Sequence, residues 1–383
     1  MRRLALKPRA DWQARAAELG FAHHTIDGAP YWDETACYAF TLAEIENDIE
    51  AATQSIADLS LELVERCMRD ESTLERLKIP RHAWPLMIES WRMRAPSLYG
   101  RFDFAYDGKG PPKLLEYNAD TPTSLFEAAV FQWHWLEDGR TRGFLPKGAD
   151  QFNSIHEKLI ARFREIGADA LHFSCMSDSD EDACTIDYLR DCAMQAGLTT
   201  AKIEVKDIGV KGAQFVDLDD KPIARLFKLY PWEFIFADQF GRSLAMRNTQ
   251  FIEPAWKAIL SNKGALALLW EMAPGHPNLL PTFFLNDDRK SEIGNRFAQK
   301  PLWSREGANV LLVDGEDVVG RTSGTYGAEG YVRQALVDLP NFDGNYPVLG
   351  SWVIGGAPAG MGIREDASRI TGDRSRFVPH FIE

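Results

Sequence analysis

The chain has 383 residues and a formal net charge of −13. It is longer than one minimal core requires, so two or three packed subdomains are expected, and it has no run of about 18 apolar residues that would span a membrane. The acidic balance disfavours nucleic acid and anionic membrane as partners, because phosphate binding needs a basic face. It would suit a cationic substrate such as a polyamine.

Neither the first residues nor the cysteines indicate export. The segment Met1 to Arg9 is basic but has no apolar segment behind it, so it is not a secretory signal and a cytoplasmic protein is expected. The five cysteines are odd in number and include no C-x-x-C pair. This favours reduced thiols over disulfides or a zinc site.

A long amphipathic helix is the first strong element. Thr41 and Glu44 form a capping-box pattern at its start. The apolar residues that follow share one helical face, at Ile45, Ile49, Ala52, Ile56, Leu59 and Leu63. This helix is expected to be scaffold without chemistry.

A β-hairpin is predicted between residues 99 and 118. Polar and aromatic residues alternate from 101 to 106, which is the period of a half-buried strand. Residues 107–112 are turn material, and alternation resumes with Leu114, Glu116 and Asn118 on one side. We expect the aromatic face to pack inward and the other face to be polar.

The remaining elements favour the α/β (α+β) class. A strand, a helix and a second strand form a β-α-β unit at 170–176, 180–196 and 201–205. The next elements are a strand at 224–229 and helices at 256–262 and 266–272. Short strands and glycine turns fill the segment beyond 300, with strands at 309–313 and 344–354 and a glycine-rich turn at 355–362.

The hairpin offers a candidate metal site. Residues two apart on a strand point the same way, so Glu116 and Asn118 form a pair of oxygen donors that Asp103 can face. Two carboxylates and an amide oxygen suit Mg²⁺, and Arg101 beside them would meet a phosphate oxygen. Spacing alone leaves open a solvated polar face with Arg101 and Asp103 as a surface salt bridge.

Further polar residues lie downstream. Lys263, Lys300 and the loop from Pro301 to Gly307 could close over a triphosphate through charge and backbone N–H groups, or the lysines could simply be solvated. The acidic residues from Asp178 to Asp182 begin a helix. There they either stabilise the helix dipole or hold a substrate ammonium group.

Several enzyme classes lack their motifs. The sequence contains no G-x-x-x-x-G-K-[ST], H-E-x-x-H or G-x-S-x-G pattern, and Gly360-Met-Gly362 lacks the third glycine of a dinucleotide-binding fingerprint. P-loop, zinc hydrolase, serine hydrolase and nicotinamide-dependent functions therefore have no support.

The segment Leu114 to Ser124, with Arg101-Phe-Asp103 before it, resembles the synthetase domain of glutathionylspermidine synthase and its smaller bacterial relatives. The likeness continues through 253–263, 300–307, 353–356 and 363–364, so residues 12–383 would form one ligase unit behind an N-terminal lead at 1–11. The family has an ATP-grasp-type fold. The resemblance thus implies mixed and antiparallel sheets with an interleaved pre-ATP-grasp-like subdomain.

The resemblance also implies roles for individual residues. Arg101 would be catalytic, stabilising the transition state, and Asp103, Glu116 and Asn118 would hold Mg²⁺. The ATP contacts would be Arg101, Asp103, Lys263 and Lys300, then Glu306 and Gly307 in a closing loop, and Gln334, Ala335, Leu336, Val337, Val348 and residues 369–371 around the adenine.

The substrate side matches the family less closely. Thr121 stands where the family has a serine that binds the thiol tripeptide, and Leu229 replaces a substrate-binding threonine. Glu181 and Asp182 fall near an acidic pair that binds polyamine and tripeptide, and Arg364 would hold a carboxylate. The bifunctional members also carry an N-terminal amidase domain. This chain begins too late to include one, so no amidase activity is expected.

The predicted function is an ATP- and Mg²⁺-dependent ligase that joins a small-molecule carboxylate to an amine, such as glutathione to a polyamine, through an acyl phosphate. The departures at Thr121 and Leu229 leave open an amide ligase for another acid and amine, such as a peptide or cell-wall fragment. A nucleotide-binding sensor without catalysis is a further alternative.

Overall fold

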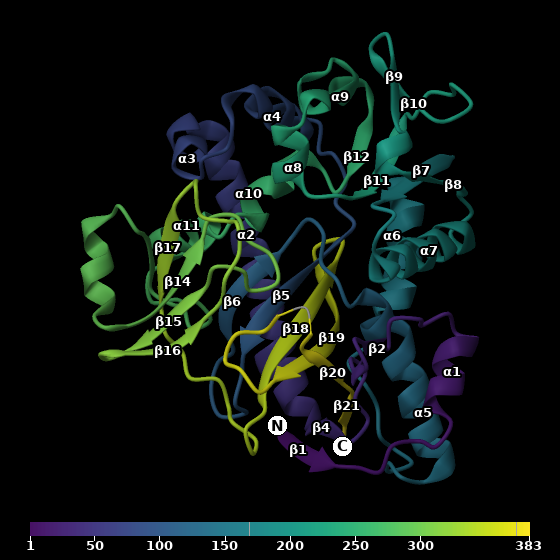
Figure 1. Cartoon of the computed structure of the whole chain (residues 1–383), viewed down its shortest axis with the longest axis vertical. Coiled ribbons are helices and arrows are strands. Elements are labelled where there is room, and N and C mark those ends of the chain that lie inside the picture. Colours follow the sequence, from purple (N-terminus) through teal and green to yellow (C-terminus); the bar gives the residue numbers. More distant parts are fainter. Residues whose placement is uncertain (168, 373) are drawn as a thin grey trace.

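Three larger sheets lie side by side in the computed structural model, which describes residues 1–167, 169–372 and 374–383 (Figure 1). Two of these sheets are antiparallel and the third is parallel. Helices join the sheets and cover their faces. This arrangement confirms the predicted α/β (α+β) class with mixed and antiparallel sheets.

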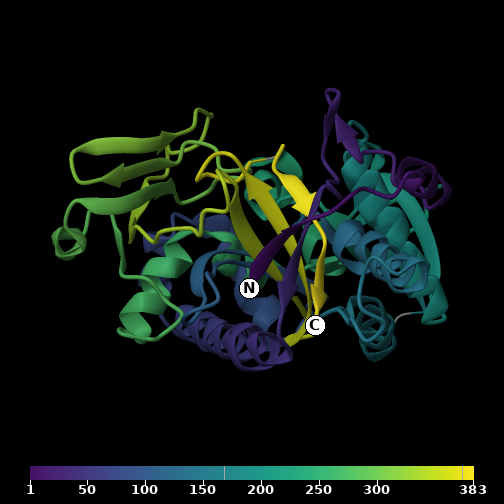
Figure 2. The same cartoon turned by 90° about the horizontal axis from the view of Figure 1, so that it is seen from below.

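The central antiparallel sheet has the strand order β20-β19-β18-β5-β6. Its long α-helix, α2 (Ala51–Arg69), continues a π-helical segment, η1 (Glu44–Glu50), and lies across one face (Figure 2). Thr53 Oγ1 on α2 lies 2.7 Å from Ser351 Oγ on the sheet. The strands are β5 (Tyr99–Ala105), β6 (Lys113–Asn118), β18 (Tyr346–Ile354), β19 (Ala357–Asp366) and β20 (Arg376–Val378).

The second antiparallel sheet has the order β13-β17-β14-β15-β16 and stands beside the central sheet. Helix α11 (Gly264–Met272) packs against its edge strand β13 and against β17. The strands are β13 (Thr282–Phe284), β14 (Arg296–Pro301), β15 (Leu311–Asp314), β16 (Asp317–Arg321) and β17 (Tyr331–Ala335).

The parallel sheet, on the other side of the central one, has the order β12-β11-β7-β8. Helix α7 (Asp180–Gln195) connects β7 to β8, and α6 (Ile155–Ile166) packs beside α7. The strands are β7 (Ala170–Cys175), β8 (Thr199–Glu204), β11 (Arg225–Leu229) and β12 (Gln250–Ile252).

The two ends of the chain meet in one small sheet. Strand β4 (Ala36–Phe40) pairs antiparallel with β1 (Arg2–Ala5) and parallel with β21 (His380–Ile382), so both termini lie together at the foot of the molecule (Figure 1). Two hairpin ribbons project elsewhere, β2 (Thr25–Ile26) with β3 (Ala29–Pro30) and β9 (Gly209–Lys211) with β10 (Gln214–Val216).

Shorter helices complete the scaffold. The α-helices are α1 (Trp12–Glu18), α3 (Glu71–Arg76), α4 (Trp84–Arg92), α5 (Gln132–Arg142), α8 (Trp232–Ala237), α9 (Ala245–Asn248) and α10 (Ala258–Ser261). The π-helical segment η3 (Glu127–Phe131) precedes α5, and 3-10 turns are η2 (Arg81–Ala83), η4 (Val205–Asp207), η5 (Gln239–Arg242), η6 (Ala255–Lys257) and η7 (Asp288–Ile293). Across the described parts of the chain, no helix is both long and apolar enough to cross a membrane.

Most predicted elements are present, but the segment 355–362 was predicted wrongly. Only Gly355 and Gly356 form a turn, and the following glycines belong to β19. A Cβ at Gly360 would lie 2.8 Å from the Ile155 side chain, and one at Gly362 would lie 2.7 Å from the Phe377 ring. These glycines therefore allow close packing onto the strand and do not form a longer turn. The helix predicted at 256–262 is also divided, into η6 and α10.

Candidate functional site

The β5–β6 hairpin brings the predicted polar residues together. Arg101 pairs with Asn118 and Asp103 pairs with Glu116 across the two strands. The alternative of a solvated face is wrong, because Arg101 is 4% exposed and Asp103 is 2% exposed. Gly350 on the neighbouring strand β18 makes room for Arg101, since a Cβ there would lie 2.7 Å from Arg101 Cδ.

A β-bulge corrects the predicted alternation on β6. The register shifts between Asp103 and Phe104, so that Phe104 pairs with Leu114 and Leu115 is the extra residue. Leu114 therefore packs into the hydrophobic core with Phe104, away from Glu116. The bulge also turns Leu115 toward the cavity between the two antiparallel sheets, which it helps to line.

The oxygen donors of the hairpin converge. Asn118 Nδ2 lies 3.1 Å from Asp103 Oδ2 and 3.3 Å from Glu116 Oε1. Rotation of the Asn118 amide by 180° would present its oxygen beside the two carboxylates instead. Two carboxylates and one amide oxygen in this arrangement form a hard donor set that fits Mg²⁺.

Cationic side chains neutralise both carboxylates. Asp103 accepts hydrogen bonds from Arg101 Nε at 2.7 Å and from Arg364 Nη2 at 2.7 Å. Lys263 Nζ lies 3.1 Å from Glu116 Oε2. Burial would raise the pKa of Glu116, but the ammonium groups of Lys263 and Lys300 outweigh it and hold this pKa well below its usual range. Glu116 is therefore ionised at neutral pH.

The residues predicted to contact ATP, except Arg101 and Glu306, line one cavity between the central and second antiparallel sheets. Lys300 Nζ donates to Gln334 Oε1 at 2.8 Å and to the Leu115 carbonyl oxygen at 2.8 Å. The lining includes Asp103, Glu116, Lys263, Lys300, Gly307, Gln334, Ala335, Leu336, Val337, Val348 and residues 369–371. Burial lowers the pKa of Lys300 to about 8, although the charge of Glu116 opposes this.

Glu306 is not among the lining residues of that cavity, whereas Gly307 is. Both have positive φ, at 52° and 67°. A Cβ at Gly307 would lie 2.7 Å from the Thr371 carbonyl oxygen, so the loop packs closely there. The preceding Arg305 donates to Thr121 Oγ1 and, at 3.1 Å, to Glu233 Oε1.

Two substrate candidates, Glu181 and Asp182, lie beyond the carboxyl end of the parallel strand β7. Glu181 and Asp182 begin α7, which follows β7, and Ser179 caps this helix by accepting from the Asp182 backbone N–H at 3.1 Å. Burial raises the pKa of Asp182 to about 6, with Arg305 opposing the shift. Strand order reverses between β7 and β11, and ligands of open parallel sheets bind at such a point.

Leu229, which stands where the family has a substrate-binding threonine, is buried in the core. It ends β11 but is 4% exposed and packs in the hydrophobic cluster around Phe227 and Tyr99. Its side chain therefore does not offer a contact to a polar substrate.

A buried ion pair fixes the segment that joins the hairpin to the substrate side. Lys228 Nζ lies 2.5 Å from Asp120 Oδ1, and the Trp232 backbone N–H donates to Asp120 Oδ2 at 2.8 Å. Burial lowers the pKa of Lys228, with Asp120 opposing the shift. The pair anchors residue 120 to β11 and α8.

The comparisons with known proteins identify the family. The model of the glutathionylspermidine synthase preATP-grasp family matches residues 3–383. The chain belongs to this family. Its ATP-grasp-like fold class agrees with the family description.

Similar proteins within the family are named as ligases or synthetases. A Haemophilus influenzae protein named "Putative acid--amine ligase" is 42% identical, over 98% of this chain and 97% of its own length. Trypanothione synthetase of Crithidia fasciculata is 29% identical over 84% of this chain, and the Escherichia coli bifunctional glutathionylspermidine synthetase/amidase is 28% identical over 90% of it. The chain spans 53% and 59% of those two proteins. Together these names confirm the prediction of an enzyme of the acid–amine ligase class.

Residues that were not predicted gather beside Glu181. His23 Nε2 lies 2.9 Å from Glu127 Oε1, and the Ser124 backbone N–H donates to Glu181 Oε1 at 3.2 Å. Tyr31 hydroxyl lies 2.9 Å from Ser124 Oγ. Residue 127 lies three positions after the family motif, which ends at Ser124, and this was the one signal that pointed here. His23 had no local pattern.

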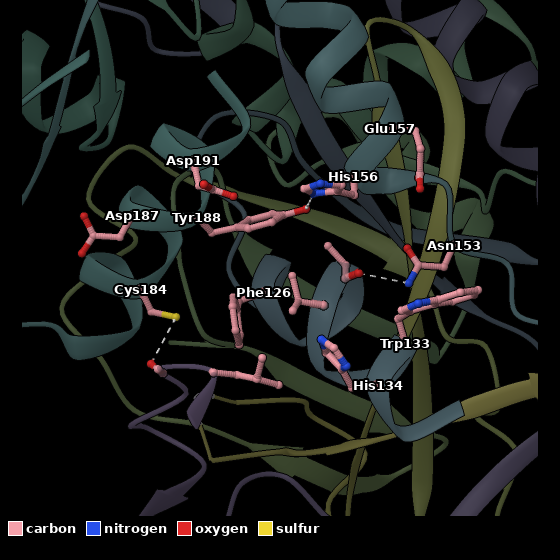
Figure 3. Close-up of a pocket in the computed structure, with 14 residues that line it drawn as sticks. Phe126, Trp133, His134, Asn153, His156, Glu157, Cys184, Asp187, Tyr188 and Asp191 are labelled. Carbon is pink, nitrogen blue, oxygen red and sulfur yellow. Dashed lines mark hydrogen bonds between the residues drawn. The ribbon is translucent and has the colours of Figure 1, made fainter. Parts of the chain in front are cut away.

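Figure 3 shows a separate cavity of about 590 Å³, whose lining comes close to this cluster in the sequence. Its lining includes Phe126, which precedes Glu127, and Cys184, one turn after Glu181. Tyr188 hydroxyl lies 3.2 Å from His156 Nδ1 on its far wall. Burial, and then the charge of Glu127, raise the pKa of the Cys184 thiol to about 12, so this thiol stays protonated and unreactive at neutral pH.

Proposed function

We propose that the chain is a cytoplasmic, ATP- and Mg²⁺-dependent ligase that joins a small-molecule carboxylate to an amine. The cavity between the two antiparallel sheets supports this most directly, because it combines two lysines, two carboxylates and an apolar wall. The lysine ammonium groups can bind phosphate oxygens through charge-assisted hydrogen bonds. The apolar side chains of Ala335, Leu336 and Val348 can pack against a planar base. Glu306, which precedes Gly307 in the loop between β14 and β15, would close over the nucleotide.

The residues of the hairpin suggest how the reaction proceeds. Mg²⁺ held by Asp103, Glu116 and Asn118 would neutralise charge on the phosphates. Arg101 would stabilise the phosphoryl group as it passes from ATP to the substrate carboxylate, since such transfers depend mainly on positioning and electrostatics. The amine would then attack the acyl phosphate, releasing phosphate and leaving an amide. Arg364, Thr121 and the acidic pair Glu181 and Asp182 would bind the two substrates.

Turnover of ATP in the presence of acid and amine pairs tests this function. We expect ADP release with Mg²⁺ only when both substrates are present, and glutathione with a polyamine is the first pair to assay. Tight ATP binding without ADP release for every pair would favour a sensor. The core position of Leu229 supports a second candidate, an amide ligase for another acid, such as a peptide or cell-wall fragment.

Glu116→Gln tests the metal site. The Mg²⁺ concentration for half-maximal ADP release should rise about tenfold or more. Mutating even a residue that only hydrogen-bonds to a metal ligand commonly lowers metal affinity by that factor. Magnesium titrations of the variant and the wild type measure this shift. Glu292→Gln, an exposed change on η7, is the control and should leave the titration unchanged. An unchanged midpoint for Glu116→Gln would contradict its role.

The low pKa of Lys300 predicts a pH dependence of nucleotide binding. Below about pH 8 the ammonium group is protonated and attracts phosphate. As pH rises through 8 the charge is lost, so the affinity for Mg²⁺ and a non-hydrolysable ATP analogue should fall by up to about tenfold per pH unit. Calorimetric titrations between pH 7 and 9.5 measure this. Lys300→Arg, which stays charged, should give a flatter profile, and equal profiles would refute the assignment.

A further inference from the structure

Three acid–base side chains from distant segments meet at the start of α7. His23 comes from the loop before β2, Glu127 begins η3 and Glu181 lies in the first turn of α7. One ligand atom of each lies within 4.8 Å of the other two. His23 and Glu127 are buried, and Glu181 is half-buried.

Within the described residues, this cluster has no lysine or arginine as a counter-charge. Among the side chains the structure describes, neither Glu127 nor Glu181 pairs with a lysine or arginine, whereas Asp103 and Glu116 both do. Two carboxylates this close in a buried setting favour an extra shared proton. Accordingly burial, and then the charge of Glu127, raise the pKa of Glu181 to about 7. His23 opposes the shift, and Asp182 on the same helix adds to it.

One peptide unit links Glu181 to Arg101. Arg101 Nη1 donates to the Thr123 carbonyl oxygen at 2.5 Å, and the Ser124 N–H of the same peptide bond donates to Glu181 Oε1 at 3.2 Å. Ser124 has a φ of 66°, in the left-handed region, and its hydroxyl contacts Tyr31. The local fold thus connects Glu181, through one peptide unit, to the arginine assigned above to the phosphoryl group.

The second half of the reaction needs a proton acceptor at this place. An aliphatic amine is an ammonium ion at neutral pH, and its nitrogen cannot attack until it loses a proton. We propose that Glu181, positioned by Ser124, Glu127 and His23, takes that proton from the amine substrate. The nitrogen electron pair then forms the C–N bond and the C–O bond to phosphate breaks. Phosphate leaves with the electron pair of that C–O bond and takes up the second proton, which the nitrogen loses as it becomes an amide. This inference rests on the proposed function.

Hydroxylamine separates proton removal from the other steps, because it is already uncharged at neutral pH and yields a hydroxamate. We expect Glu181→Gln to lower kcat for amide formation by about a hundredfold or more. Hydroxamate formation from glutathione, or from the acid found in the ADP assay, should stay within about twofold of wild type. Glu127→Gln should show the same pattern more weakly. Asp180→Asn, an exposed change in the same helical turn, should alter neither.

The outcomes separate the two hypotheses. Glu181→Gln could lower the rates of amide and hydroxamate formation equally, or raise KM for the amine with kcat unchanged. Either outcome would overturn the role of Glu181 as proton acceptor while leaving the ligase assignment intact. A wild-type protein that forms neither ADP nor hydroxamate with any acid would contradict the ligase function, and this inference with it. Thermal unfolding of each variant establishes that a loss of rate does not reflect a loss of fold.

Discussion

Replacing Arg101 with alanine should lower the rate of ADP-coupled amide formation by about a hundredfold or more. The guanidinium group is buried beside Asp103 and donates to the Thr123 carbonyl oxygen, so it is held in place before ligands bind. Removing one preorganised charge contact of this kind costs on the order of 3 kcal/mol in the transition state. Steady-state rates with saturating substrates measure the effect.

The fold should survive this substitution. Arg364 still pairs with Asp103 when Arg101 is absent, so the carboxylate keeps one cationic partner. The circular dichroism spectrum should therefore remain close to that of the wild type. Arg140→Ala, on the exposed side of α5, serves as the control and should retain full activity. A near wild-type rate for Arg101→Ala would remove Arg101 from the mechanism.

Lys228→Met should give the largest loss of stability among the changes considered. The ammonium group and Asp120 form a pair in which both side chains are almost fully buried. Removing the lysine leaves an uncompensated carboxylate, and such changes cost about 3 to 5 kcal/mol. Urea unfolding followed by tryptophan fluorescence measures the free energy of unfolding.

A second change should recover part of that loss. Asp120→Asn in the Lys228→Met background removes the unpaired charge but keeps an oxygen for the Trp232 N–H. We therefore expect the double variant to be more stable than Lys228→Met alone. Lys221→Met, an exposed control, should change the unfolding free energy by no more than about 0.5 kcal/mol. A loss below about 1 kcal/mol for Lys228→Met would refute the argument.

The hairpin could be predicted because its signals are local. Alternation of polar and aromatic residues indicates a strand wherever it occurs, and the turn residues between the strands lie next to them. Its burial could not be predicted in this way. Arg101 and Asp103 are enclosed by β18 and by Arg364 of β19, which come from the other end of the chain. The bulge at Leu115 likewise depends on pairing that alternation does not reveal.

The substrate side was harder to predict for the same reason. Glu181 was found through the acidic residues at the start of a helix and their place in the family resemblance, but its neighbours His23 and Glu127 reach it only in the folded chain. At 355–362 the sequence instead predicted a feature that does not form, a glycine-rich turn. The number of glycines indicated a turn. Gly360 and Gly362 instead lie in β19, where Ile155 and Phe377 pack too closely to leave room for a side chain. Packing partners that are distant in sequence decided both cases.

The order of the central sheet has a consequence for biosynthesis. Strand β5, which carries Arg101 and Asp103, is hydrogen-bonded to β6 on one side and to β18 on the other, and β18 leaves the ribosome long after β5. Until then one edge of β5 remains unpaired, and open strand edges invite aggregation. We therefore expect this edge to need shielding during much of translation, and the cavity between the two antiparallel sheets is completed only near the end of synthesis.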